Sequence, residues 1–199
     1  MKIGQHPFCS PSLLRNRGFS IVEVLVSVVV LTIGMLGMLA LQAATLQANR
    51  DARLQSVGAL LARELADMMR GNPVEFAEDA ASNIYLAPIS AALAPQTANF
   101  CLRANDAATP GCTSTVQVAQ AQMTEWLARV KTELPGARVV VCKDSAPFDA
   151  AGLARWNCTA GATDPIVIKI GWTRSSTNRS LTGTAALQRA TVPSVVFTV

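Results

Sequence analysis

The sequence predicts an α+β protein in which a long N-terminal helix, membrane-spanning in its first half, packs against a small antiparallel β-sheet domain. Three observations predict this class. An almost uncharged apolar run covers residues 19–41, apolar residues at helical spacing continue it to about residue 70, and the last third of the chain alternates with period two. Helix first and strands afterwards is the pattern of an α+β fold.

The apolar run is long enough to cross a membrane. Its about 23 residues would form a helix of roughly 34 Å, against a hydrocarbon core of about 30 Å. Lys2, Arg15 and Arg17 precede it without any acid, which favours a cytoplasmic N-terminus with the rest of the chain outside. A secretory signal peptide fits less well, because its apolar core is shorter and a small-residue cleavage site should follow. A simple membrane anchor fits, but leaves Glu23, the only charged residue of the run, unexplained.

The residues around Glu23 carry a resemblance to a known signal. Gly18-Phe19-Ser20-Ile21-Val22-Glu23, after a basic leader, resembles the class III signal of type IV pilins and pseudopilins. The resemblance implies that prepilin peptidase cuts between Gly18 and Phe19, methylates the new amine of Phe19 and leaves the helix in place. It also implies that Glu23 pairs with the terminal amine of a neighbouring subunit, setting axial register or recruiting the subunit to the assembly platform. Such a pair attracts far more strongly in an apolar bundle than in water. A tolerated glutamate near the membrane interface is the alternative.

Two further segments narrow the resemblance to one group of pilins. Residues 33–42 (IGMLGMLALQ) and 66–73 (ADMMRGNP) resemble the PilV family of minor pilins, the type IV pilus modification proteins. The family implies a structural protein of a priming or tip complex that supports pilus assembly, adhesion and twitching motility. Its expected partners are prepilin peptidase, other minor pilins, the major pilin, the assembly platform and a tip adhesin. Its expected location is the bacterial inner membrane, with the C-terminal domain in the periplasm, and then the pilus at the cell surface.

Two other interpretations remain open. Minor pseudopilins of type II secretion systems share the leader and the helix. A membrane-anchored periplasmic binding module with an uncleaved helix belongs to a different functional class. Gly34 and Gly37 allow either close helix packing or local melting of the apolar helix, because each weakens a helix by about 1 kcal/mol relative to alanine.

The remaining elements follow in chain order. We expect a leader at 1–18, the membrane and assembly helix at 19–41, an amphipathic stalk helix at 42–71 and a periplasmic domain at 72–199. The stalk carries its apolar stripe on Leu54, Val57, Leu61, Leu65 and Met68, and Gly71-Asn72-Pro73 ends it.

Within the domain, residues 72–115 predict a long loop with one or two helical turns. Residues 116–134 have helical spacing, with Ser114 or Thr115 as the cap and Pro135-Gly136 as the stop.

Strands are predicted from residue 137 onward. Residues 137–142, 165–172 and 194–199 are the stronger predictions, 185–190 is a weaker one, and 174–179 is expected to be a polar turn. The second strand places Ile166, Ile168, Ile170 and Trp172 on one face and Val167 and Lys169 on the other.

Four cysteines follow the leader, which itself holds Cys9. An even number in a chain sent across the membrane predicts disulfides, and Cys101–Cys112 with Cys142–Cys158 is favoured, because each pairing closes a short segment that contains turn formers. The spacing does not fit a zinc site, so no metal is expected.

Composition argues against several other functions. The net charge of +4 falls to about +1 without the leader, which leaves 14 Lys and Arg against 13 Asp and Glu and gives no reason to expect nucleic-acid binding. The only histidine, His6, lies in the leader, and neither a Walker A sequence nor G-x-G-x-x-G is present. We therefore expect no enzyme and no cofactor.

Overall fold

The computed structural model describes residues 18–78, 82–89, 93–103, 111–159, 161, 163–176 and 180–199. The leader before Gly18, including His6, Cys9 and its three basic residues, lies outside the described residues. The chain divides into two compact units, residues 1–47 and residues 48–199.

The predicted long N-terminal helix is confirmed. Helix α1 runs from Ile21 to Gly71 and contributes to both units. All its residues in the first unit are exposed. In the globular second unit, Leu61 and Leu65 of the predicted stripe are buried in the core together with Ala62, Ala66 and Met69. Leu54, Val57 and Met68 pack against the same core but stay partly exposed.

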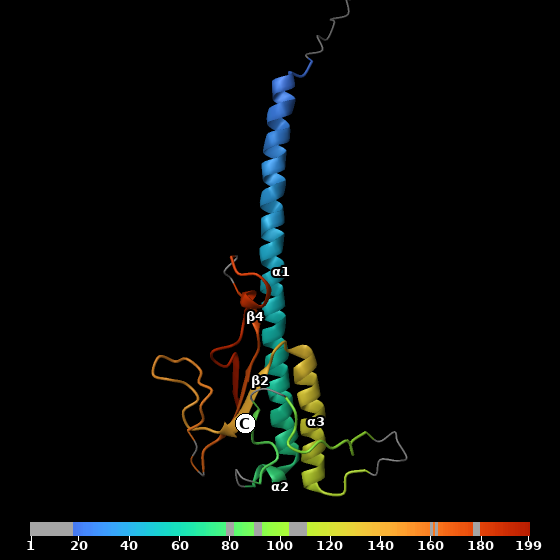
Figure 1. The fold of residues 1–199 in the computed structure, drawn as a ribbon, viewed down its shortest axis with the longest axis vertical. Helices are drawn as coiled ribbons and strands as arrows, with labels where there is room; N and C mark the ends of the chain where they lie inside the picture. The colour runs from blue at the N-terminus through green and yellow to red at the C-terminus, as the bar shows by residue number, and fades with distance from the viewer. Residues whose placement is uncertain are drawn as a thin grey trace, which may run out of the picture. The chain divides into compact units, whose positions relative to one another are not determined.

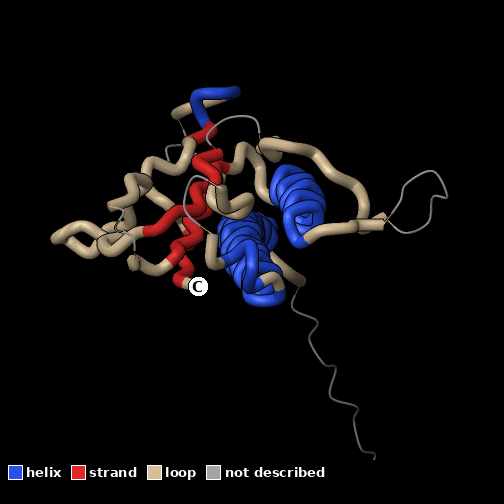
Figure 2. Tube along the Cα trace, turned by 90° about the horizontal axis from the view of Figure 1, so that it is seen from below, coloured by secondary structure: helices blue, strands red, loops and turns tan. Residues whose placement is uncertain are grey.

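A second long helix completes the helical layer of the globular unit. Helix α3 (Thr115–Glu133) is capped by Ser114, whose hydroxyl accepts a hydrogen bond from the Gln117 backbone N–H at 3.2 Å, so Ser114 is the correct one of the two predicted caps. The indole of Trp126 is fully buried and donates to the Leu61 carbonyl of α1 at 2.9 Å. The strands and α3 lie on different sides of α1 (Figures 1 and 2).

The other layer is a four-stranded antiparallel sheet with the order β1-β2-β3-β6. Strands β2 (Arg138–Lys143), β3 (Ile166–Gly171) and β6 (Val195–Thr198) confirm the three stronger strand predictions. Val139 and Val141 of β2 and Ile166, Ile168 and Ile170 of β3 face the core between sheet and helices. The fold class is therefore α+β, as predicted.

Three details of the sequence prediction were wrong or incomplete. The expected loop at 72–115 contains the predicted helical turn as α2 (Pro73–Phe76), but also strand β1 (Ala87–Ile89), which was not predicted because it is short and carries Pro88. The expected turn at 174–179 begins as strand β4 (Arg174–Ser175), which pairs with β5 (Leu187–Gln188); residues 177–179 lie outside the described part. The weak strand at 185–190 shrinks to β5, because the 3-10 turn η1 (Gly183–Ala186) occupies the residues before it.

Candidate functional site

The candidate processing site lies just before α1. Gly18 and Phe19 are non-helical and exposed, and Phe19 keeps 82% of its surface accessible. Ser20 starts the helix: its hydroxyl accepts from the Val22 N–H at 3.3 Å, and its carbonyl accepts from the Glu23 N–H at 3.0 Å. Ser20 and Glu23 have the S-x-x-E spacing of a helix start, a signal that the sequence analysis did not use. Two non-helical, accessible residues, Gly18 and Phe19, therefore lie directly before the start of the helix.

Glu23 sits in that first turn. A carboxylate is favoured there, because the helix dipole and the free N–H groups of the first turn place positive charge near it. Among the described residues, however, its carboxylate has no hydrogen-bond or ion-pair partner. The site thus holds one carboxylate at the start of an apolar helix with its pairing capacity unused.

The hydroxyl groups further along this segment are, by contrast, satisfied within the helix. Ser27 Oγ donates to the Glu23 carbonyl at 2.7 Å, and Thr32 Oγ1 donates to the Val29 carbonyl at 2.8 Å. Such bonds to the preceding turn let small polar side chains enter an apolar environment. Glu23 is therefore the polar group of this segment that needs a partner from elsewhere.

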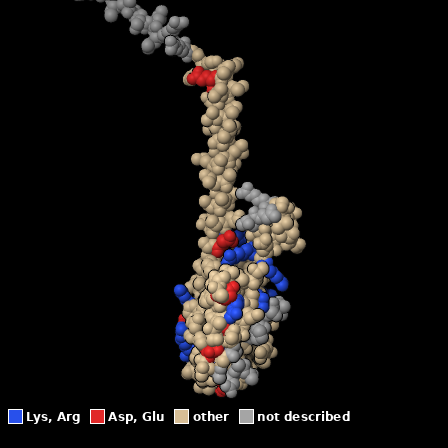
Figure 3. Space-filling view, turned by 90° about the vertical axis from the view of Figure 1, so that its left-hand side faces the viewer, with Lys and Arg blue, Asp and Glu red and all other residues tan. Residues whose placement is uncertain are grey.

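The surface of the segment is apolar throughout. Large apolar residues from Phe19 to Leu41 keep between 48% and 85% of their surface exposed. Figure 3 shows this part of the helix without charge apart from one acidic group near its beginning, where the sequence has Glu23. By length and composition α1 is a candidate membrane span, a test that a signal sequence would also pass. An apolar surface of this extent needs lipid or other helices around it.

Gly34 and Gly37 have no neighbour among the described residues that would require a glycine. A methyl group added at either position would meet nothing within 4 Å. Both expected explanations, contact with another helix and local melting, therefore remain open for these two residues.

Comparison with known protein families finds a match that covers the start of the apolar helix. Residues 13–39 match the family model of the prokaryotic N-terminal methylation motif, which is a prepilin signal of the type IV pilin kind. The match supports a type IV pilin or pseudopilin. No curated protein and no solved structure matches the chain. The motif implies processing by prepilin peptidase and assembly with other pilins, and together with the apolar helix it fits a pilin anchored in the inner membrane.

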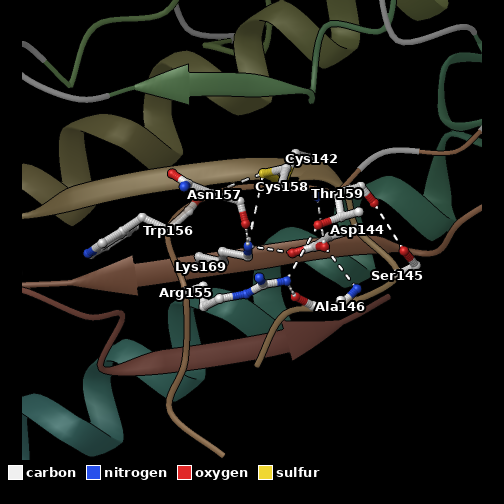
Figure 4. The surroundings of a disulfide bond; sticks show 10 residues. All are labelled: Cys142, Asp144, Ser145, Ala146, Arg155, Trp156, Asn157, Cys158, Thr159 and Lys169. Carbon is white, nitrogen blue, oxygen red and sulfur yellow. Dashed lines mark hydrogen bonds and ion pairs between the residues drawn. A yellow bond between two sulfur atoms is a disulfide. The ribbon is translucent and has the colours of Figure 1, made fainter. Parts of the chain in front are cut away.

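In the globular unit of this pilin-like chain, the cysteines form two bridges. The structure contains the disulfides Cys101–Cys112 and Cys142–Cys158, the two pairings that the sequence favours. The second bridge ties the end of β2 to the loop between β2 and β3, and this loop covers the sheet face opposite the helices (Figure 4). The sulfur atoms and a carboxylate oxygen of Asp144 lie within 4.8 Å of one another. They offer no free set of metal ligands, because the sulfurs are bonded to each other and Lys169 holds the carboxylate.

Lys169 lies fully buried beneath that loop. Its ammonium donates to Asp144 Oδ2 at 2.5 Å and to the Asn157 carbonyl at 2.8 Å, while Asp144 Oδ1 accepts from the backbone N–H groups of Ala146 and Thr159, each at 3.0 Å (Figure 4). Burial alone would raise the pKa of Asp144, but the hydrogen bonds from Lys169 and the two N–H groups outweigh it and lower the pKa below its ordinary 3.8. The alternation correctly placed Lys169 opposite the isoleucines, but it did not indicate that the loop buries this second face as well.

Proposed function

We propose that this chain is a structural minor pilin of the PilV type. In this proposal residues 1–18 are the leader, prepilin peptidase cuts between Gly18 and Phe19, and Phe19 carries the methylated amine. Residues 19–41 then anchor the subunit in the inner membrane, residues 42–71 form the stalk, and residues 72–199 form the periplasmic domain. The observation that carries the proposal is the methylation-motif match over residues 13–39, on an exposed cleavage segment followed by an uncovered apolar helix.

Glu23 has a physical role in this proposal. Cleavage creates a cationic amine at Phe19, and the Glu23 carboxylate supplies the opposite charge at the start of the apolar helix of a neighbouring subunit. A charge pair formed among packed apolar helices is strong, whereas either charge alone is penalised there. Helices offset along the filament axis would leave both charges unpaired, so the pair selects one axial register. The two disulfides support the periplasmic location of the domain, because disulfides persist in oxidising compartments.

The first experiment tests processing. The full chain is expressed in cells that contain prepilin peptidase, and its intact mass and N-terminus are measured by mass spectrometry. We expect N-methyl-Phe19 in the wild type and retention of the residues before Phe19 in Gly18→Ala. Gly34→Ala is the matched control, because it makes the same change at an open position within the helix and should mature normally. Normal maturation of Gly18→Ala, or a retained leader in the wild type, would contradict the proposal; the retained leader would favour an anchored binding module.

The second experiment tests assembly. Glu23→Gln should leave cleavage intact but lower the amount of subunit in sheared pili about tenfold, because hydrogen bonds to charged groups contribute on the order of 1.5–3 kcal/mol. Glu23→Asp keeps the charge and should retain most of the incorporation. An unchanged level of Glu23→Gln in sheared pili would remove the assembly role from this residue.

The motif match supports pseudopilins of type II secretion equally, so the machine itself must be identified. The proposal places the subunit in a priming or tip complex with the other minor pilins, the major pilin, the assembly platform and a tip adhesin. Deleting the protein should reduce surface pili, adhesion and twitching motility. Loss of protein secretion with normal pili would assign the chain to type II secretion instead.

A further inference from the structure

The globular unit contains a cavity whose walls come from distant parts of the chain. It has a volume of about 630 Å³, within the range of small-molecule sites. Its walls are formed by Leu93, by α3 and the turn after it, by the start of β2, by the end of β3 with Trp172, and by the segment after β5. The lining residues that matter most are Lys131, Leu134, Ala137, Arg138, Trp172 and Arg189.

The ionised residues that line this cavity are all cationic. Lys131, Arg138 and Arg189 contribute, and among the described residues no carboxylate lines the space. None of the three has an ion-pair partner within the described part of the chain. Arg138 lies over the ring of Trp156, with its guanidinium carbon 4.2 Å from the ring centre, and its buried Nε has no hydrogen-bond partner among the residues that the structure describes. Cations gathered around one space without an anion repel one another, so these side chains give the cavity a positive potential.

Trp172 contributes an apolar wall to the same cavity. Its side chain is only 1% exposed, and its indole N–H, which has no hydrogen-bond partner among the described residues, is buried away from the open space. Three cations without an ion-pair partner around one cavity indicate a negatively charged ligand that is rich in acceptor oxygens.

We propose that this cavity binds a phosphate monoester. A phosphate monoester carries a charge of about −1.5 to −2 at neutral pH and three strong acceptor oxygens, which suits three cationic side chains better than a single carboxylate does. Arginine binds phosphate through its planar fork of N–H groups, and lysine adds a point charge. The cavity is larger than inorganic phosphate needs, and Leu134, Ala137 and Trp172 provide apolar walls for the organic part of the ligand. The inference concerns the globular unit alone and does not depend on the pilin assignment.

The phosphate could belong to a soluble metabolite or to a lipid headgroup, and two arms of one experiment separate these sources. The full chain is purified in dodecyl maltoside micelles. Binding of sn-glycerol 3-phosphate is measured by titration calorimetry, and binding of phosphatidic acid, added in the same detergent, is compared with binding of phosphatidylcholine. We expect binding that weakens with added salt, because screening reduces the attraction between the charges.

The variants decide whether the cavity is responsible. Lys131 and Arg189 are exposed, so Lys131→Gln and Arg189→Gln should leave the fold intact; each should weaken binding about tenfold and the double variant about a hundredfold. Arg63→Gln is the matched control, since it removes an exposed arginine of α1 that does not line the cavity, and it should bind like the wild type.

Binding in the soluble arm or in the phosphatidic acid arm that follows this pattern supports the site and identifies its source. Absence of binding in both arms, or binding that the double variant retains, would overturn the proposal.

Discussion

Replacing Lys169 by methionine should destabilise the globular unit by about 3 kcal/mol at pH 7. The substitution keeps a long side chain in the space but leaves the Asp144 carboxylate buried without its cation. Breaking a buried ion pair in this way typically costs about 3–5 kcal/mol. We expect the lower end, because Asp144 keeps its hydrogen bonds from the backbone N–H groups of Ala146 and Thr159. Since a domain is stable by only about 5–15 kcal/mol, the loss is large but leaves the unit folded.

Urea unfolding of the full chain in mild detergent measures this loss. The fluorescence of the buried Trp126 and Trp172 reports on the globular unit, and with a slope of about 1–3 kcal/mol per molar urea the midpoint should fall by roughly 1–3 M. Lys131→Met, at an exposed lysine of α3, is the control and should change stability by less than about 0.5 kcal/mol.

A double variant tests the cause of the loss. Lys169→Met with Asp144→Asn removes both charges, while the amide oxygen still accepts from the two backbone N–H groups. It should recover most of the stability, because the cost comes from an uncompensated charge. A single variant that costs less than about 1 kcal/mol, or a double variant that recovers nothing, would refute the reasoning.

Three further predictions concern the same unit. Gly58→Ala should lower the melting temperature, with a cost of about 1–3 kcal/mol, because the added methyl would lie 2.7 Å from the Trp172 ring; an unchanged melting temperature would show that the indole moves freely. Replacing Cys142 and Cys158 by serine should cost about 3 kcal/mol in urea unfolding, the value for a closed loop of this length, and equal stability of the oxidised wild type and the variant would contradict this. Because folding lowers the pKa of Asp144, this carboxylate contributes fully to the free energy of unfolding above its ordinary pKa of 3.8, and the contribution is lost as the pH falls through the lower folded-state value. The wild type should therefore lose stability below pH 4 in a way that Asp144→Asn does not, and identical pH profiles of the two proteins would disprove this contribution.

The sequence could predict the elements whose signals are local. Helix α1 follows from an uninterrupted apolar run and a stripe at helical spacing, and β2, β3 and β6 follow from β-branched residues with period two. Strand β1 could not be predicted, since three residues including Pro88 carry no strand signal and pair only because β2 lies beside them. The short pairing of β4 with β5 likewise depends on contacts between distant segments.

The candidate sites also divide into those with a local signal in the sequence and those that form only when distant segments meet in the fold. Gly18, Phe19 and Glu23 stand in one short signal, so the sequence alone was enough to propose them together as site residues. The burial of Lys169 was missed because it depends on a loop that the Cys142–Cys158 bridge holds over β3, and alternation along the strand says nothing of such a cover. The cavity was missed because Arg189 is far along the chain from Lys131 and Arg138, and only the folded globular unit brings the three residues to one space.

The loop that the Cys142–Cys158 disulfide holds over β3 also affects when the sheet domain becomes fully stable. Formation of the Cys142–Cys158 disulfide needs an oxidant. The buried ammonium of Lys169 is stable only when the carboxylate of Asp144 lies beside it. In the proposed route, a newly made chain in the reducing cytosol lacks this disulfide, so its sheet domain is less stable before export than after it. Oxidation in the periplasm would then stabilise the folded form on the side of the membrane where the proposed subunit acts.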